Sequence, residues 1–195
     1  MKTLYFIRHG ISQHNVLFHN LGKRVFYDKR YYDTKLTSQG IEQAIKLRNT
    51  WEKLNEIELV ICSPLTRTIQ TTNHLFNTTN VNIISHDMLK EFPQGLQTIN
   101  KRKEKSELQK LFPNIDFTEV NHVNNIWNPE REETIDELNQ RIEKFREFIE
   151  TRNETNIAIV GHNSFIGQFI HQKIPLMENG DKELLHCHPY EYIFE

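Results

Sequence analysis

The residues of this chain that are best suited to chemistry follow two apolar runs. Arg8 and His9 come directly after residues 3–7. His162 follows a second such run at residues 156–160. A guanidinium can clamp the oxygens of a phosphate or carboxylate, and an imidazole can act as a nucleophile or a proton carrier. These residue types indicate the handling of a small anion, although a strand that ends in an ordinary turn accounts equally well for the first run.

Arg67 and Glu91 offer a further cation and a carboxylate. Arg67 falls in the first turn of a helix predicted from residue 66, where the helix dipole disfavours a cation, so we expect a bound anion to hold it. Glu91 lies in a predicted loop and can act as a general acid only if its pKa is raised. The neighbouring Met88 and Phe92 are expected to raise that pKa by desolvation. The simpler interpretations are a surface arginine paired with carboxylates and a solvent-exposed loop glutamate.

Short apolar strands alternate with amphipathic helices along the chain, a pattern typical of a mainly parallel sheet. Residues 156–160 are the most apolar run and are predicted to form a central strand. The carboxyl ends of parallel strands open into a crevice where ligands bind, so such a sheet would bring the candidate residues together. Residues 23–33 are predicted to form a loop. The predicted strands are 3–7, 58–62, 81–84, 156–160 and 191–194, and the predicted helices are 12–21, 38–54, 66–76, 101–111, 134–149 and 165–170.

Five short motifs are distributed along residues 4 to about 170. Their residue types and their order resemble the histidine phosphatase superfamily, also called phosphoglycerate mutase-like, and in particular its small phosphatase-type members. The resemblance implies an α/β fold, a three-layer α/β/α sandwich with a mainly parallel central sheet. The motifs are Arg8-His9-Gly10-x-Ser12-x-x-Asn15, Leu36-Thr37 with Gly40 and Gln43-Ala44, Ser63-Pro64-Leu65-x-Arg67-Thr68, Leu89-x-Glu91-x-x-x-Gly95, and Gly161-His162.

The resemblance also implies roles for individual residues. His9 would be the nucleophile that takes the phosphoryl group, and Glu91 would be the acid that protonates the leaving oxygen. Arg8, Arg67 and His162 would form the phosphate pocket, and they belong with His9 and Glu91 to the implied catalytic set. Such an imidazole nucleophile needs one ring nitrogen held as a donor to a backbone oxygen and the other ring nitrogen free. Beside a phosphate dianion, His162 is expected to be cationic and to donate.

Three residues that follow the first histidine bear on the substrate. Ser12 and Asn15 are expected to bind substrate, with Asn15 as a neutral donor. His14 is expected to be a wall of the pocket or a surface residue, and it stands where the mutases of the superfamily usually carry Trp. Asn163 likewise replaces a residue that is more often small. Both departures put the identity of the substrate in question and leave the core chemistry as expected.

Composition sets limits on partners and location. A length of 195 residues predicts a single domain over residues 1–195. A net charge of -2, from 24 basic and 26 acidic residues, gives no overall field that would attract nucleic acid or an anionic membrane. No apolar run approaches the ~20 residues of a membrane span, and the first residues do not read as a signal peptide. We therefore expect a cytoplasmic protein that binds neither nucleic acid nor a membrane, and the resemblance implies that its partner is a small phosphorylated molecule. The sequence does not indicate its oligomeric state.

No metal site and no cofactor are expected. His186, Cys187 and His188 resemble metal ligands in type, but adjacent residues of a strand point to opposite sides. Cys62 and Cys187 are expected to be free thiols, with Cys62 in the core at the end of a strand. Cys62 and Arg67 are separated by four residues, whereas the anion-binding loop of tyrosine phosphatases has five, so this cysteine chemistry is excluded.

The resemblance leaves the reaction open between hydrolysis and transfer between hydroxyls. Cofactor-dependent mutases carry a substrate-enclosing insertion after the loop of the acid, and residues 95–134 are short by comparison. A mutase must exclude water between its two transfers, so we favour hydrolysis by a histidine acid phosphatase-like enzyme. The alternatives are a phosphoglycerate mutase, which would use 2,3-bisphosphoglycerate, and a non-catalytic phosphate-binding protein. The basic loops 23–30 and 101–105 are interpreted as solvated surface or as a lid that contacts substrate.

Overall fold

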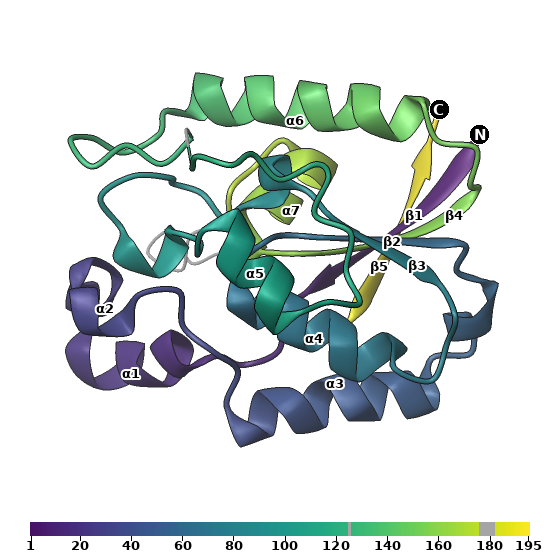
Figure 1. Ribbon diagram of the computed structural model, residues 1–195, viewed down its shortest axis with the longest axis horizontal. Helices are drawn as coiled ribbons and strands as arrows, with labels where there is room; N and C mark the ends of the chain where they lie inside the picture. The colour runs from purple at the N-terminus through teal and green to yellow at the C-terminus, as the bar shows by residue number, and fades with distance from the viewer. Residues whose placement is uncertain (125, 176–181) are drawn as a thin grey trace.

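A five-stranded sheet lies at the centre of the structure, a computed structural model that describes residues 1–124, 126–175 and 182–195 (Figure 1). The strand order is β3-β2-β4-β1-β5. All neighbouring pairs are parallel except β1 and β5, which are antiparallel. The middle position of β4 confirms the strand predicted to be central. The strands are β1 (Lys2–Arg8), β2 (Leu59–Cys62), β3 (Asn82–Ser85), β4 (Asn156–Gly161) and β5 (Pro189–Phe194).

The register of β1 and β4 brings the two sequence motifs with histidine together. Arg8 pairs with Gly161, so the two strands end at the same level. The backbone N–H of His9 then donates to the carbonyl of Gly161 at 3.0 Å. His9 and His162 therefore leave neighbouring strands side by side at the carboxyl edge of the sheet.

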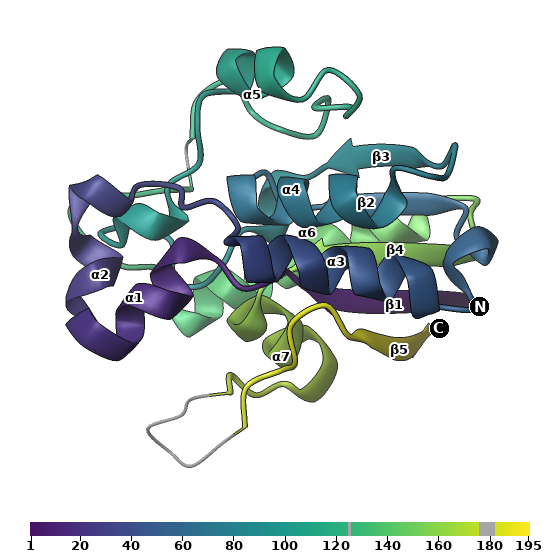
Figure 2. The ribbon, with the colours of Figure 1, turned by 90° about the horizontal axis from the view of Figure 1, so that it is seen from below.

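Side chains alternate between the two faces of the sheet and bury both of them. One face packs against α6 and α7, and the other packs against α3 and α4, while α5 lies on the β3 side of the molecule (Figures 1 and 2). This arrangement confirms the predicted three-layer sandwich. The helices are α1 (Gln13–Leu21), α2 (Arg24–Tyr27), α3 (Ser38–Thr50), α4 (Thr66–Phe76), α5 (Lys105–Leu111), α6 (Ile135–Glu150) and α7 (Asn163–His171).

The amphipathic pattern of α6 shows how the sequence specifies these layers. Leu138, Ile142 and Phe145 recur at helical spacing and are buried against the sheet. The helix begins after Thr134, whose hydroxyl accepts a hydrogen bond from the backbone N–H of Glu137 at 3.3 Å. The Glu137 carboxylate accepts in return from the backbone N–H of Thr134 at 2.9 Å. This capping box fixes the start of the helix that covers the sheet.

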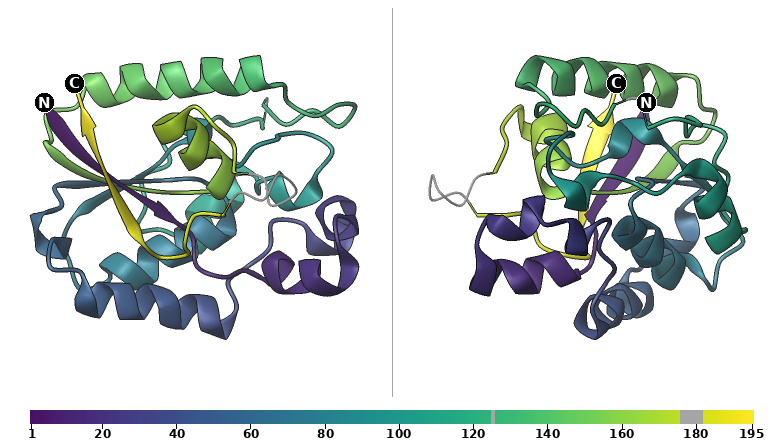
Figure 3. Two further views of the ribbon diagram at one scale, coloured as in Figure 1. Left: turned by 180° about the vertical axis from the view of Figure 1, so that it is seen from behind. Right: turned by 60° about the vertical axis from the view of Figure 1, so that its left-hand side comes forward.

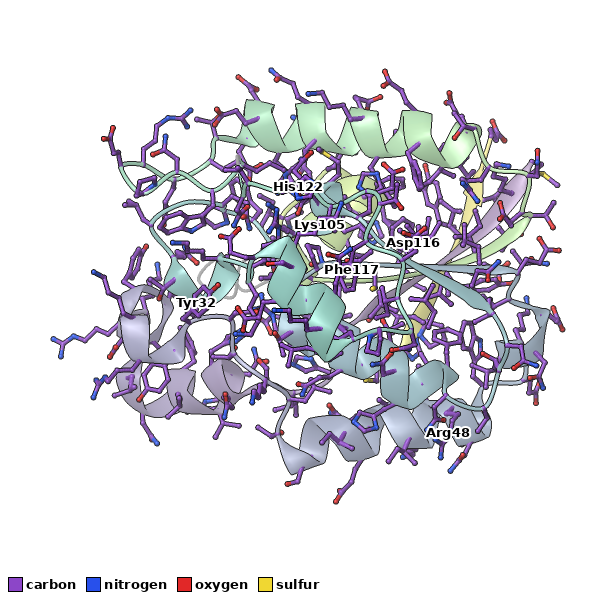
Figure 4. All side chains as sticks on the ribbon, viewed as in Figure 1. Tyr32, Arg48, Lys105, Asp116, Phe117 and His122 are labelled. Carbon is purple, nitrogen blue, oxygen red and sulfur yellow. The ribbon has the colours of Figure 1, made fainter. Side chains whose placement is uncertain are left out.

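Two sequence predictions are wrong in detail. Residues 23–33 do not form a loop: α2 and the 3₁₀ helix η1 (Lys29–Tyr31) lie there, because Val25 is fully buried and Asp28 accepts from the backbone N–H of Arg30. The charged helix predicted from residue 101 begins only at Lys105, labelled in Figure 4. The preceding Arg102 is fully buried, so this part of the basic loop 101–105 is not solvated surface.

Two further segments frame the carboxyl edge of the sheet. α1 and α2 lie beyond that edge, away from the chain termini (Figure 3). On the side of β3, Asp116 extends the sheet by a backbone bridge to Ile84, and the neighbouring Phe117 is buried beneath α5 (Figure 4). None of the described helices is long and apolar enough to cross a membrane. The remaining 3₁₀ helices are η2 (Leu54–Glu56), η3 (Asp87–Leu89) and η4 (Thr98–Asn100).

Candidate active site

His9 is held in the orientation and the protonation state that a nucleophile requires. Its Nδ1 lies 2.7 Å from the carbonyl oxygen of Gly10. A carbonyl oxygen only accepts, so Nδ1 carries the proton and donates it. Burial, followed by the charge of Arg67, lowers the pKa of His9 well below its ordinary value of 6.5. The ring is therefore neutral near pH 7, and its Nε2 is unprotonated and carries a lone pair.

Two glycines let a helix start approach the turn that follows His9. A Cβ on Gly10 would lie 2.4 Å from the carbonyl oxygen of Gly40, and a Cβ on Gly40 would lie 2.1 Å from the carbonyl oxygen of Ile11. The hydroxyl of Thr37 donates to the same Ile11 oxygen at 3.0 Å. The side-chain oxygen of Gln43 accepts from the Ile11 backbone N–H at 2.9 Å. The motif at residues 36–44 thus packs against the turn that follows His9 and holds this turn in place.

Arg67 projects from the first turn of α4 toward His9. Its Nε donates to His9 Nε2 at 3.3 Å, which agrees with an unprotonated Nε2. Its Nη1 and Nη2 donate to the carbonyl of Ile99 at 2.8 Å and to Oδ1 of Asn100 at 3.0 Å. These acceptors are neutral, so the structure places Arg67 beside His9 and not in a surface ion pair. Burial lowers the pKa of Arg67 to about 10, which leaves it cationic at pH 7.

Arg8 is 4% exposed, and part of its guanidinium is bonded within the chain. Its Nη1 donates to the carboxylate of Glu183 at 2.8 Å and to the carbonyl of Leu184 at 2.7 Å. Its Nε is buried and has no hydrogen-bond partner among the described residues. A buried donor without an acceptor is costly, and a phosphate oxygen would supply that acceptor.

His162 lies beside His9, with ring centroids 5.2 Å apart. Its Nε2 lies 2.8 Å from the hydroxyl oxygen of Ser63. Its Nδ1 is buried and unpartnered within the described part of the chain. Burial and the charge of Arg67 lower the pKa of His162 well below 6.5. In the structure His162 is thus neutral, and the cationic form expected from the sequence would require an added negative charge nearby.

Glu91 lies near Arg67 and is bonded to the beginning of α7. Its Oε1 accepts from the backbone N–H of Phe92 at 2.8 Å and of Phe165 at 3.3 Å. Its Oε2 accepts from the backbone N–H of Ser164 at 3.4 Å. Desolvation raises the pKa of Glu91 above its ordinary value of 4.5, while these N–H groups and Arg67 oppose the rise. The rise by desolvation agrees with the prediction, and the backbone N–H of Phe92 partly opposes it.

Ser12 and Asn15 lie next to this group but are bonded to each other at the start of α1. The hydroxyl of Ser12 donates to Oδ1 of Asn15 at 2.6 Å, and the backbone N–H of Ser12 donates to the same oxygen at 3.0 Å. The ring of His14 lies 6.1 Å from that of His9 and contacts the hydroxyls of Ser12 and Thr34. The structure thus brings Arg8, His9, Arg67, His162 and Glu91 together, and it gives Ser12 and Asn15 bonds within the chain.

His186 was missed by sequence reasoning, which considered it only as a metal ligand. Its ring centroid lies 5.5 Å from that of His9, and its Nδ1 lies 2.6 Å from the His9 carbonyl oxygen, so Nδ1 donates. Burial lowers the pKa of His186 to about 4. Only tertiary structure brings residues 177 positions apart into contact, so the sequence held no signal for this pairing. Across the described residues no group of three His, Cys, Asp or Glu side chains is arranged to hold a metal ion.

Comparisons with known proteins agree with this geometry. The family model of the histidine phosphatase superfamily (branch 1) matches residues 4–187. A phosphoglycerate mutase-like protein of Arabidopsis thaliana is 32% identical over 196 residues, which cover 85% of this chain and 72% of that protein.

Solved structures share the fold. The α-ribazole phosphatase from Shigella flexneri matches with a TM-score of 0.62 at 24% identity, over 97% of this chain and 89% of that chain. The phosphoserine phosphatase from Entamoeba histolytica, in complex with 3-phosphoglyceric acid, matches with a TM-score of 0.62 at 19% identity, over 100% of this chain and 91% of that chain. With the family model matching nearly the whole length, the conclusion is direct: the chain belongs to the histidine phosphatase superfamily, branch 1.

Proposed function

We propose that this protein is a phosphomonoester hydrolase that acts on a small phosphorylated metabolite through a covalent phosphohistidine at His9. The observation that carries the proposal is the bonding of His9, whose Nδ1 donates to Gly10 while Nε2 faces Arg67. One nitrogen is fixed and the other is a nucleophile beside a cation. A chain that only bound phosphate would have no need of an unprotonated nitrogen there.

In the first step, Nε2 of His9 attacks phosphorus as the P–O bond to the leaving group breaks. Arg8 and Arg67 stabilise the charge on the non-bridging oxygens, which is most of what phosphoryl transfer requires. The raised pKa of Glu91 favours its protonated form, and this acid gives its proton to the leaving oxygen. The products of the step are an alcohol, a phosphohistidine and a Glu91 carboxylate.

In the second step, water replaces the alcohol and attacks the phosphorus. The Glu91 carboxylate takes a proton from that water, the P–N bond breaks, and the electron pair returns to Nε2 of His9. Phosphate is released, and both His9 and Glu91 regain their starting states. His162 is proposed to donate to a phosphate oxygen through its buried Nδ1, which has no partner among the described residues.

The test is to trap the intermediate. After incubation with a phosphate-labelled aryl phosphate and a rapid quench, the protein should carry label that is stable in base and labile in acid. His9→Ala should abolish both the label and the hydrolysis, without loss of the folded state by circular dichroism. His19→Ala, which removes an exposed histidine on α1, is the matched control and should label normally. Unchanged hydrolysis by His9→Ala would refute the mechanism.

The same protein can be tested for the two alternative functions. Incubation with 3-phosphoglycerate and a trace of 2,3-bisphosphoglycerate should release phosphate slowly or not at all; rapid formation of 2-phosphoglycerate would identify a mutase. Phosphate binding without turnover of any member of a panel of phosphorylated metabolites would identify a non-catalytic phosphate-binding protein. That panel also measures which substrate is preferred.

A further inference from the structure

A buried ion pair behind the Glu91 loop consists of Glu133 and Arg141, and nothing in the proposed chemistry uses it. Both side chains are 3% exposed. Nε and Nη2 of Arg141 donate to the two carboxylate oxygens of Glu133 at 2.7 and 2.8 Å. Burial of two charges is costly unless the geometry is good and the remaining donors are satisfied. The remaining donors of Arg141 therefore show what the pair is bonded to.

Those donors go to the backbone on the N-terminal side of Glu91. Nη1 of Arg141 donates to the carbonyl of Lys90 at 2.7 Å and also to the carbonyl of Met88. These two carbonyls belong to the residue that precedes Glu91 and to the middle residue of η3. The guanidinium of Arg141 thus fixes residues 88–90 relative to α6, the helix that carries Arg141.

Glu133 holds the C-terminal side of the same loop. Its backbone N–H donates to the carbonyl of Gln94 at 2.7 Å, and its Oε2 accepts from the backbone N–H of Gln94 at 3.1 Å. The side-chain Nε2 of Gln94 then donates to the backbone carbonyl of Glu91 itself at 2.8 Å. The ion pair is therefore bonded to the loop on both sides of the acid.

Arg141 also lies behind the helix end that receives the Glu91 carboxylate. Its guanidinium carbon lies 5.4 Å from the centre of the Phe165 ring. The backbone N–H of Phe165 is one of the donors to Oε1 of Glu91, at 3.3 Å. A single guanidinium thus contacts both the loop that carries the acid and the residue that receives it.

We propose that Glu133 and Arg141 are positioning residues for Glu91. They fix the carboxyl group against the N-terminus of α7 and leave its proton aimed at the leaving oxygen. The inference rests on the proposed acid role of Glu91. Displacements of about 1 Å in a catalytic group can cost about 100-fold in rate, and a flexible ammonium cannot reproduce the planar fork of an arginine. Arg141→Lys should therefore misplace the acid while keeping the charge.

The experiment measures kcat/KM for a series of phosphate esters, from nitrophenyl to alkyl leaving groups. A good leaving group departs without a proton, whereas a poor one needs the acid. Misplacement of Glu91 should therefore steepen the dependence of kcat/KM on leaving-group pKa. We expect Arg141→Lys to lower kcat/KM for alkyl phosphates by about 10- to 100-fold and for nitrophenyl phosphate by less than about 3-fold. A purely structural defect would lower all members of the series by one factor, and that result would overturn the inference.

Arg146→Lys is the matched control. Arg146 lies on the same helix, and its guanidinium packs over the ring of Phe169 at 4.4 Å on the sheet side, away from the loop. It should keep the wild-type dependence on the leaving group. Glu133→Gln provides a second variant if Arg141→Lys does not fold. Glu133→Gln keeps the size of the side chain but removes the charge that pairs with Arg141. It should steepen the dependence of kcat/KM on leaving-group pKa in the same way.

Glu91→Gln separates the two proposals. If Glu91→Gln itself leaves the leaving-group dependence unchanged, then Glu91 is not the acid and the proposed function fails at that step. If Glu91→Gln steepens it and Arg141→Lys does not, only the positioning role is refuted. In the Glu91→Gln background, Arg141→Lys should add no further steepening, because the proton that it positions is gone. Added steepening there would contradict the inference.

Discussion

Lys90 is a fully buried lysine that should govern how the stability of this protein depends on pH. Its Nζ donates to Oδ1 of Asn124 at 2.5 Å and lies 3.5 Å from Oδ1 of Asp87. Burial lowers the pKa of Lys90 from 10.5 to about 7. Asp87 opposes this shift, and the nearby charges of Arg102 and Arg141 add to it.

Folding changes the number of protons that Lys90 binds. In the unfolded chain it holds its proton up to about pH 10.5, whereas in the folded chain it releases the proton near pH 7. Between these two values the unfolded state binds more protons, so the free energy of unfolding rises with pH. The slope for one proton is about 1.4 kcal/mol per pH unit, and over the whole interval the gain is at most ~5 kcal/mol.

Lys90→Met tests this contribution. The thioether side chain keeps most of the buried volume and does not titrate, and Asp87 retains its bonds to Arg102 at 2.8 and 3.2 Å. The measurement is the free energy of unfolding in urea at half-unit steps from pH 7 to 9.5. The difference between wild type and Lys90→Met should rise by about 1.4 kcal/mol per pH unit in favour of the wild type.

Lys110→Met, which removes an exposed lysine of α5, is the control for the loss of one positive charge. Its stability should follow that of the wild type across the whole pH range. Parallel curves for wild type and Lys90→Met would refute the reasoning, because they would mean that Lys90 keeps the same proton affinity in both states. The test is independent of any catalytic role, since it measures stability alone.

Three further predictions concern the nucleophile, a helix cap and the missed histidine. The pKa of His9 is lowered well below 6.5, so the acid limb of kcat/KM, corrected for ionisation of the substrate phosphate, should lie well below pH 6.5; an acid limb at or above that value would contradict a neutral His9. Thr134→Ala removes the hydroxyl that accepts from the Glu137 N–H and should lower the free energy of unfolding by about 1 kcal/mol, measured in urea. His186→Ala leaves the His9 carbonyl without its donor and should cost about 1–3 kcal/mol, whereas His186→Asn, whose amide nitrogen can take the place of Nδ1, should retain most of that stability.

The layers of the fold and the place of the candidate site could be predicted from local sequence. The helical spacing of apolar residues predicts which face of α6 is buried, and the apolar run at residues 156–160 predicts β4. Arg8 ends β1, and His9 and His162 follow β1 and β4, so parallel pairing brings them to one edge of the sheet. These inferences needed only the chain order and the preference of apolar residues for the interior.

Contacts that depend on tertiary packing could not be predicted in the same way. Arg102 stands in a basic sequence that looks like solvated surface, yet it pairs with Asp87, fifteen positions away, inside the protein. In the sequence, Glu133 and Arg141 look like ordinary charged surface residues at and before a helix. Only the folded path of residues 88–94 shows what they bind. In each case a polar side chain found its partner through a fold that local patterns do not encode.

The charges around His9 also bear on the protonation of His9 and His162 before and after phosphate binds in the proposed reaction. Arg67 lowers the pKa of both His9 and His162, after the larger effect of burial. This keeps both rings neutral, as attack by His9 requires, because a protonated imidazole has no lone pair to offer. A phosphate dianion between Arg8 and Arg67 would oppose that effect and favour the charged form of a neighbouring imidazole. His9 cannot be protonated at Nε2 once that atom is bonded to phosphorus, whereas Nδ1 of His162 has no hydrogen-bond partner among the residues that the structure describes. The same two arginines therefore keep the nucleophile unprotonated before attack and, once they bind the phosphoryl group, allow His162 to take a proton and donate to it.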